Sequence, residues 1–176
     1  MKYTLYFCRC IVFNMKIGIL SDTHSTLHPQ ALDFFSPCDE IWHTGDIGSI
    51  EIINELEKFK PLRAVYGNID GYDIRAKLQE HLFFETGGLS VLMMHIGGYP
   101  PKYTAQSKDL IGQYKPDIFA CGHSHILKVM YDNTHKLLYI NAGAAGNYGF
   151  HKAITFLRFD IENKRPANLE VFHQER

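Results

Sequence analysis

Residues 17–24 read IGILSDTH, an apolar run that ends in the polar motif Asp22-Thr23-His24. The run predicts a buried strand over residues 16–21, with an Asp and a His just beyond its end. In an open α/β sheet, ligands bind in the crevice at the strand ends. We therefore expect this stretch to set both the fold class and the position of a functional site.

The same arrangement, a predicted strand followed by polar side chains, recurs along the chain. The further motifs are Gly45-Asp46 after residues 39–43, the segment 67–70 with Asn68 and Asp70, His95 after residues 91–94, and the segment 122–125 with His123 and His125. Carboxylates, imidazoles and one amide at several strand ends are the ingredients of a two-metal site, which activates water and clamps a phosphoryl group.

Each motif has an ordinary alternative when it is read alone. Asp22 and His24 would share one side of an extended segment, because side chains alternate along a strand, but a turn Asp beside a surface His is common. Asp46 could bridge two cations through its two oxygens, or it could cap a helix near Ser49. His95 could be a ligand or a satisfied buried histidine. Only the ordered set favours a metal site.

The two remaining motifs carry sharper signals. Asn68 offers a neutral oxygen that suits a hard cation, although Asn-x-Asp also forms plain turns. Asp70 is better placed to orient a neighbouring ligand. A His-x-His pair after a buried strand, as at His123 and His125, can point two imidazoles toward a pair of metals. His28, His81, His135, His151 and His173 lack such a context and are expected to be surface or structural residues, whereas His43 could lie behind the ligands.

Composition narrows the class of protein. The 176 residues suit one domain, 45% are apolar and 21% are charged, and the formal net charge is −1. A net charge near zero does not favour non-specific binding to nucleic acids, but it is compatible with a nucleotide substrate. The four cysteines match no zinc pattern and are expected to be reduced thiols. With no bilayer-spanning apolar run, we expect a cytoplasmic protein with no membrane partner.

The pattern of elements predicts two sheets. Residues 16–66 alternate as βαβαβ, which favours parallel strands, and residues 83–95 form a hairpin around Gly87-Gly88. An amphipathic helix is expected over residues 105–114, and strands over 117–121, 127–131, 137–140, 153–161 and 168–172. These are too many strands for one sheet, so we expect two stacked sheets with helices outside. We take Met15 as the natural start, residues 1–14 as an N-terminal extension or an extra edge strand, and residues 15–176 as a single domain.

Taken together, the motifs resemble those of the calcineurin-like metallophosphoesterase superfamily, whose pattern runs Asp-x-His, Gly-Asp, Gly-Asn-x-(Asp/Glu), His and Gly-His-x-His. The resemblance covers residues 16 to about 160, and the short length is similar to the YfcE-type small phosphodiesterases. It implies a four-layer α/β/β/α sandwich of two mixed β-sheets flanked by helices.

The resemblance also implies a ligand assignment at a dinuclear site. Asp22, His24 and His125 would hold one metal, Asn68, His95 and His123 the other, and Asp46 would bridge them. Manganese would be the usual metal, with iron, zinc, nickel or magnesium as alternatives. The implied reaction is hydrolysis of phosphodiesters or activated phosphate esters by a metal-bridging hydroxide, without a protein nucleophile.

Two positions depart from the family pattern. Protein phosphatases of the superfamily have a His that protonates the leaving group where this chain has Ile69, and loss of a general acid typically costs about 10²- to 10⁴-fold. This argues against a phosphoserine phosphatase and fits a phosphodiesterase. The second departure is Asn141-Ala-Gly143-Ala144, where relatives often have Asn-Pro-Gly-Ser, and we expect only a small backbone effect.

Two rival functions stay open at this point. One is a non-catalytic scaffold like the retromer subunit that shares the fold; the complete ligand set speaks against it. The other is a hydrolase of cyclic nucleotides or dinucleoside polyphosphates, which needs a base-stacking aromatic such as Tyr99, Tyr103 or Tyr148. The expected partner is a small phosphate ester, with no stable nucleic-acid binding, and self-association through symmetric patches is left open.

Overall fold

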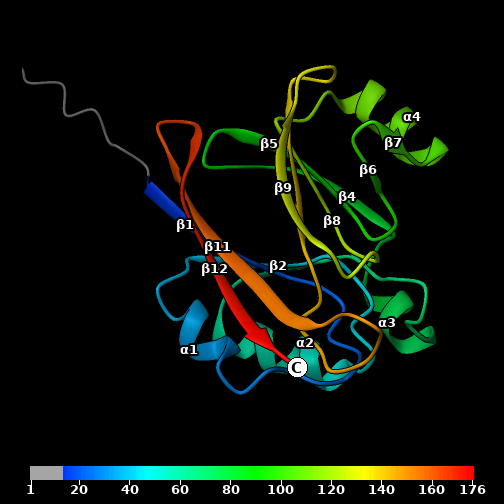
Figure 1. Ribbon diagram of the computed structural model, residues 1–176, viewed down its shortest axis with the longest axis vertical. Coiled ribbons are helices and arrows are strands. Elements are labelled where there is room, and N and C mark those ends of the chain that lie inside the picture. Colours follow the sequence, from blue (N-terminus) through cyan, green and yellow to red (C-terminus); the bar gives the residue numbers. More distant parts are fainter. Residues whose placement is uncertain (1–13) are drawn as a thin grey trace, which may run out of the picture.

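Two five-stranded sheets form the centre of the structure, a computed structural model that describes residues 14–176. The sheets lie face to face, and helices cover their outer faces (Figure 1). Both sheets are mixed, because each contains parallel and antiparallel neighbours. The predicted four-layer sandwich is therefore confirmed.

The first sheet has the strand order β12-β11-β1-β2-β3. β1, β2 and β3 run parallel, as the βαβαβ pattern predicted, whereas β11 pairs antiparallel with β1 and with β12. Its strands are β1 (Asn14–Leu20), β2 (Glu40–His43), β3 (Leu62–Ala64), β11 (Ala153–Glu162) and β12 (Arg165–Glu175).

The second sheet has the order β4-β5-β8-β10-β9. β5, β8 and β10 run parallel, and β4 and β9 lie antiparallel at the two edges. Its strands are β4 (His81–Thr86), β5 (Leu89–Met94), β8 (Ile118–Cys121), β9 (Leu127–Asp132) and β10 (Leu137–Ala142); a small hairpin of β6 (Gly98–Tyr99) and β7 (Lys102–Tyr103) lies outside it.

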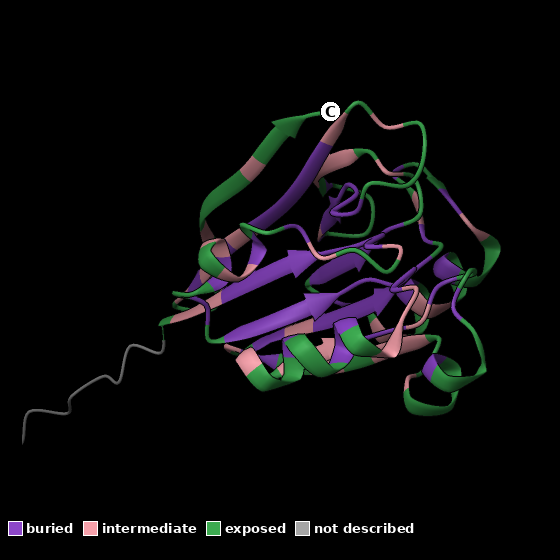
Figure 2. Ribbon diagram, turned by 90° about the horizontal axis from the view of Figure 1, so that it is seen from below, coloured by how far each residue is buried: buried purple, intermediate pink, exposed green. Residues whose placement is uncertain are grey.

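Alternation along the strands divides the apolar side chains among three cores. In β1, Ile17 and Ile19 point into the core between the sheets, whereas Leu20 faces the helices. In β8, Ile118 points between the sheets and Phe119 points to the other side. The central strands are thus buried on both faces, as the purple strands in Figure 2 show, whereas the edge strand β12 is largely exposed.

In residues 14–176, four helices cover the sandwich: α1 (Ala31–Phe35), α2 (Ile50–Phe59), α3 (Tyr72–Lys77) and α4 (Ala105–Tyr114). Ile52, Ile53 and Leu56 bury the apolar face of α2 against the first sheet, at the spacing seen in the sequence. Ile111 does the same for α4 against the second sheet. None of the described helices is long and apolar enough to cross a membrane.

The expected N-terminal extension, residues 1–14, lies outside the described residues except for Asn14, which pairs with Glu162 at the start of β1. Neither α3 nor the β6–β7 hairpin was expected from the sequence.

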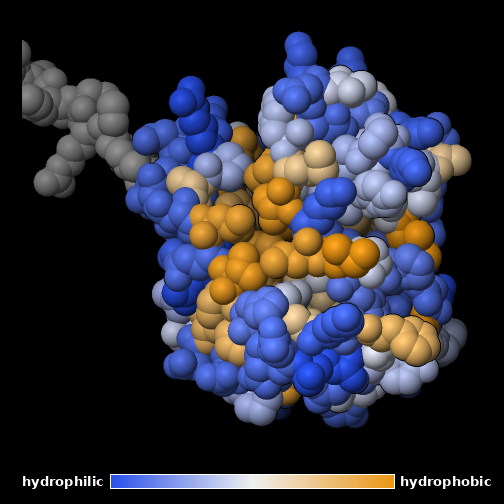
Figure 3. Space-filling model, in the orientation of Figure 1, coloured by the Kyte–Doolittle hydropathy of each residue, from blue (hydrophilic) through white to orange (hydrophobic). Residues whose placement is uncertain are grey.

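One face of the sandwich carries an apolar hollow of about 550 Å³. Its lining includes Val129 and Tyr131 of β9, Ile140 of β10 and Leu169 of β12, and Figure 3 shows apolar side chains gathered on this face. The hollow shares no residue with the polar strand ends described next.

Candidate metal centre

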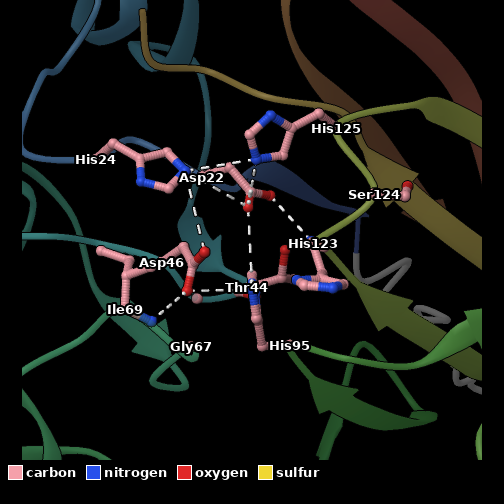
Figure 4. A network of polar contacts seen from close by, with 12 residues as sticks. Asp22, His24, Thr44, Asp46, Gly67, Ile69, His95, His123, Ser124 and His125 are labelled. Carbon is pink, nitrogen blue, oxygen red and sulfur yellow. Dashed lines mark hydrogen bonds and ion pairs between the residues drawn. The ribbon is translucent and has the colours of Figure 1, made fainter. Parts of the chain in front are cut away.

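Polar side chains from both sheets meet where four strands end. Asp22 and His24 follow β1, Asp46 follows β2, His95 follows β5, and His123 and His125 follow β8. Figure 4 shows these six side chains pointing toward one another. Parallel strands bring their carboxyl ends to one edge, which explains the convergence of segments far apart in the sequence.

The six side chains form two groups of three. Asp22, His24 and His125 make one group, and Asp46, His95 and His123 the other; within each group the candidate ligand atoms lie within 4.8 Å of one another. The closest ionic contacts are His125 Nε2 to Asp22 Oδ1 and His95 Nε2 to Asp46 Oδ1, both at 3.1 Å. The first group has the members of one ligand set that the resemblance implied, and the second brings His95 and His123 of the other set together with Asp46.

The two groups lie against each other. His24 Nε2 is 3.9 Å from Asp46 Oδ2, and His95 Nε2 is 3.9 Å from Asp22 Oδ1, so each carboxylate faces an imidazole of the other group. Two groups in contact in this way could hold two neighbouring cations.

Left-handed backbone, rather than strand alternation, turns the side chains inward. The sequence-based expectation placed Asp22 and His24 on an extended segment, and this is wrong because both residues have positive φ. Positive φ is uncommon outside glycine and clusters at functional sites. Five of the six grouped residues have it: Asp22 (54°), His24 (46°), Asp46 (53°), His123 (68°) and His125 (55°).

Two imidazoles are oriented by contacts of Nδ1, the ring nitrogen that points away from the centre of the site. His95 Nδ1 donates to the carbonyl of Thr44 at 2.8 Å, so Nε2 is the nitrogen that faces Asp46. His125 Nδ1 lies 3.1 Å from His151 Nδ1. Fixing the outer nitrogen of a metal-binding histidine in this way sets its tautomer and direction. His151, expected to be a surface or structural residue, therefore belongs to the site.

Asp70 organises the backbone under the site, as its sequence context suggested. Its carboxylate accepts the N–H groups of Ile47 at 3.2 Å, Gly48 at 2.7 Å and Gly67 at 2.7 Å. Arg75 of α3 holds the same loop from the other side, because its guanidinium donates to the carbonyls of Asp70 and Gly67. Arg75 was missed in the sequence, since α3 has too few residues to show a helical period.

Glycine at position 67 permits a close approach of two backbone segments. A Cβ there would lie 2.0 Å from Asp46 Oδ1 and 2.3 Å from Asp46 N. Only a residue without a side chain lets the loop pass Asp46 at this distance. The glycine of the Gly-Asn motif is thus explained by packing against the candidate ligand.

The remaining predicted residues have different places. Asn68 is exposed and lines a hollow together with His95. Ile69 donates its N–H to Asp46 Oδ1 at 3.1 Å, while its side chain is 46% exposed. Asn141 supports the His123–His125 loop, since its amide donates to Gly122 O at 2.8 Å and Ser124 Oγ at 3.1 Å.

Burial and charge shift the pKa values of several groups at the centre, among them His43, Asp46 and His95. Burial lowers the pKa of His43, which lies behind the site with Nε2 2.9 Å from Thr23 Oγ1, to about 4. Burial acts to raise the pKa of Asp46 and to lower that of His95, but their mutual contact outweighs it. The pKa of Asp46 therefore lies below its ordinary value and the pKa of His95 above.

The donor set fits divalent cations. Asp22 Oδ1 and His95 Nε2 are buried and make no hydrogen bond with any described residue, although each lies 3.1 Å from a candidate ligand atom of its own group. Leaving a buried polar atom without a hydrogen bond is costly. Both atoms face the interior of the site, where a cation would satisfy them. Carboxylate oxygens mixed with imidazole nitrogens suit manganese, iron, nickel or zinc better than magnesium.

Comparison of the sequence with known proteins identifies the family that the motifs resemble. The model of the calcineurin-like phosphoesterase superfamily domain matches residues 15–164. A probable metallophosphoesterase of Methanothermobacter thermautotrophicus is 33% identical over 117 residues, which cover 63% of this chain and 67% of that protein. A phosphodiesterase of Methanocaldococcus jannaschii is 41% identical over 73 residues, covering 39% of this chain and 43% of that protein.

A solved structure supports the fold. Vacuolar Protein Sorting 29 from Cryptosporidium parvum superposes with a TM-score of 0.71 over 93% of this chain and 100% of that chain. The two sequences are only 16% identical, so the likeness concerns the arrangement of sheets and helices alone.

Proposed function

The chain belongs to the calcineurin-like phosphoesterase superfamily, and we propose that it is a metal-dependent phosphodiesterase with a dinuclear site. The observation that carries the proposal is the pair of adjoining Asp/His groups, whose buried Asp22 Oδ1 and His95 Nε2 make no hydrogen bond with any described residue. The phosphodiesterase relative from Methanocaldococcus jannaschii supports the diester substrate.

In this proposal, Asp22, His24 and His125 would hold one cation, and Asn68, His95 and His123 would hold the other. Asp46, whose carboxylate lies between His24 and His95, would serve both cations. The proposed metal is manganese. Two bound cations supply an activated water and charge stabilisation for the phosphoryl oxygens. The protein's part is to fix these side chains, which it does through Thr44, His151 and Asp70.

The absence of a proton donor in the side chain at position 69 determines which phosphate esters we expect the enzyme to prefer. The Ile69 side chain cannot protonate a departing oxygen, and its backbone N–H already donates to Asp46. Esters with good leaving groups, and diesters, should therefore react faster than monoesters of poor leaving groups.

The scaffold alternative has less support. A protein that only binds partners gains nothing from burying two carboxylates and an unpartnered imidazole nitrogen, which is costly without a cation. The proposal takes residues 15–176 as one catalytic domain and residues 1–14 as an extension to it.

Hydrolysis of bis(p-nitrophenyl) phosphate by metal-stripped protein, with and without added manganese, tests the proposal, with p-nitrophenyl phosphate alongside. We expect manganese-dependent cleavage that favours the diester. Inactivity with every divalent metal tried, together with failure to bind metal, would instead support the scaffold.

A further inference from the structure

We propose that a hollow beside His125, walled by Ile126, Tyr148 and Phe150, binds a flat aromatic group on the phosphate ester that the enzyme cleaves. The inference rests on the proposed function and adds the class of substrate. The hollow has a volume of about 450 Å³ and is also lined by His123 and His125. A phosphate held at the proposed centre would therefore have its ester group within reach of this wall.

The wall consists of large apolar side chains that the fold leaves in water. Phe150 is fully exposed, Tyr148 is 71% exposed and Ile126 is 65% exposed. Single exposed apolar residues are ordinary, but several that line one hollow at a site mark a binding surface. None of them packs into any of the three cores, so their place is not explained by folding.

The loop that carries the two aromatic residues is tied in place. The Arg176 guanidinium donates to the carbonyls of Gly149 and His151, each at 3.0 Å, and to that of Asn147. The Tyr148 ring lies 5.2 Å from the His24 ring, measured between centroids. Tyr148 and Phe150 are thus presented by an anchored loop at the edge of the candidate ligands, which lowers the entropy lost on binding.

The lining of this hollow selects against a charged group. Among the described residues that line it, none is Lys, Arg, Asp or Glu. The hollow on the other side of the centre carries two charged side chains, Arg75 and Glu80. Its aromatic residue, Tyr66, has the Arg75 guanidinium over its ring. A ring that stacks on exposed aromatic side chains therefore fits the first hollow better than the second. A nucleobase and a simple aryl ester share this chemistry.

Calorimetric titration of the manganese-loaded protein with two phosphonates tests the proposal. Phenylphosphonate and methylphosphonate offer the same anion to the centre and differ only in the ring. We expect the wild type to bind phenylphosphonate about tenfold more tightly, as one stacked ring typically provides. The double variant Tyr148→Ala/Phe150→Ala should lose this difference and keep its affinity for methylphosphonate. Tyr131→Ala, which removes a 54% exposed tyrosine from β9, is the matched control and should keep the difference.

A second pair of ligands, adenosine 5′-monophosphate and ribose 5-phosphate, distinguishes the two sources of the ring. If the double variant no longer prefers adenosine 5′-monophosphate over ribose 5-phosphate, the hollow binds nucleotides. If it loses only the preference for phenylphosphonate over methylphosphonate, the hollow binds aryl esters. A ring preference that survives in the double variant overturns the inference. If neither phosphonate binds and the diester is not cleaved, the proposed function itself fails.

Discussion

The Nδ1 atoms of His125 and His151 lie 3.1 Å apart, and His151 Nε2 lies 3.0 Å from the carbonyl oxygen of Gly146. Because a carbonyl can only accept, His151 donates through Nε2 and accepts through Nδ1. His125 must then donate through its own Nδ1, which leaves the lone pair of Nε2 directed at Asp22. A residue 26 positions away in sequence thus determines which nitrogen His125 offers to a cation.

The His151→Ala variant should bind manganese about 10- to 100-fold more weakly, because such supporting contacts typically have this effect on metal affinity. Titration calorimetry of the metal-stripped protein measures the change. His173→Ala, which removes an exposed histidine, is the control. Equal affinity in the two variants would contradict the role assigned to His151.

Asp46→Asn and His123→Ala should each abolish most turnover while leaving the fold largely intact. Each removes a candidate ligand, and the loss should exceed the roughly 100-fold effect of a supporting contact. The measurements are manganese-dependent hydrolysis of bis(p-nitrophenyl) phosphate, metal content per chain and circular dichroism. Wild-type-like turnover in either folded variant would remove that residue from the assignment.

Gly67→Ala should destabilise the protein by about 1–3 kcal/mol, because the new methyl group would overlap Asp46. Urea denaturation gives the free energy of unfolding. Gly112→Ala is the control: Gly112 lies within α4, and a Cβ there meets nothing within 4 Å. That variant should gain roughly 0.5–1 kcal/mol, since alanine is the better helix former. The close-approach explanation would be wrong if both variants were equally stable.

Ile69→His should make the rate less dependent on the leaving group. A histidine side chain there could protonate a departing oxygen, and the backbone N–H of residue 69 would still reach Asp46. Rates for a series of phenyl phosphodiesters with leaving groups of increasing pKa measure this dependence. We expect a steep decline in the wild type and a shallower one in the variant; parallel declines would show that the missing acid does not limit the reaction.

Acid should weaken the fold through His43. Burial lowers its pKa from 6.5 to about 4, so the unfolded chain takes up a proton at a higher pH than the folded protein does. The free energy of unfolding is therefore unaffected by the titration of His43 above pH 6.5. It decreases by about 3 kcal/mol as the pH falls from 6.5 toward 4. Urea denaturation at several pH values in this range gives the free energy of unfolding at each pH. This free energy should change less with pH in His43→Gln than in the wild type, whereas His173→Gln should keep the pH dependence of the wild type.

Much of the fold could be read from apolar periodicity. The helix over residues 105–114 was placed at its observed bounds, because its apolar spacing and the following Pro116 mark both ends. In contrast, α3 has six residues and buries only Ile74, so it left no period to detect. The β6–β7 hairpin has two residues in each strand, too few for alternation to show.

The sequence indicated the six residues that the two groups bring together, but not the backbone geometry that brings them together. The order of the motifs after strands indicated Asp22, Asp46, His95, His123 and the rest, because strand ends of parallel sheets converge. The left-handed conformation of Asp22 and His24 could not be read from the sequence, because Asp and His adopt it more often than other non-glycine residues but still in a small minority of cases. His151 was missed for a related reason: its partner His125 is a tertiary neighbour, and no local pattern connects them.

The left-handed residues around the centre also bear on how such a protein can evolve. Each non-glycine residue in that conformation costs of order 1–3 kcal/mol, and the cost falls on the metal-free chain as well as on the loaded one. Glycine would relieve it, yet glycine has no oxygen or nitrogen to offer a cation. Selection for thermal robustness and selection for turnover therefore pull these five positions in opposite directions, and a lineage that gave up the chemistry would be free to discard the strained side chains first.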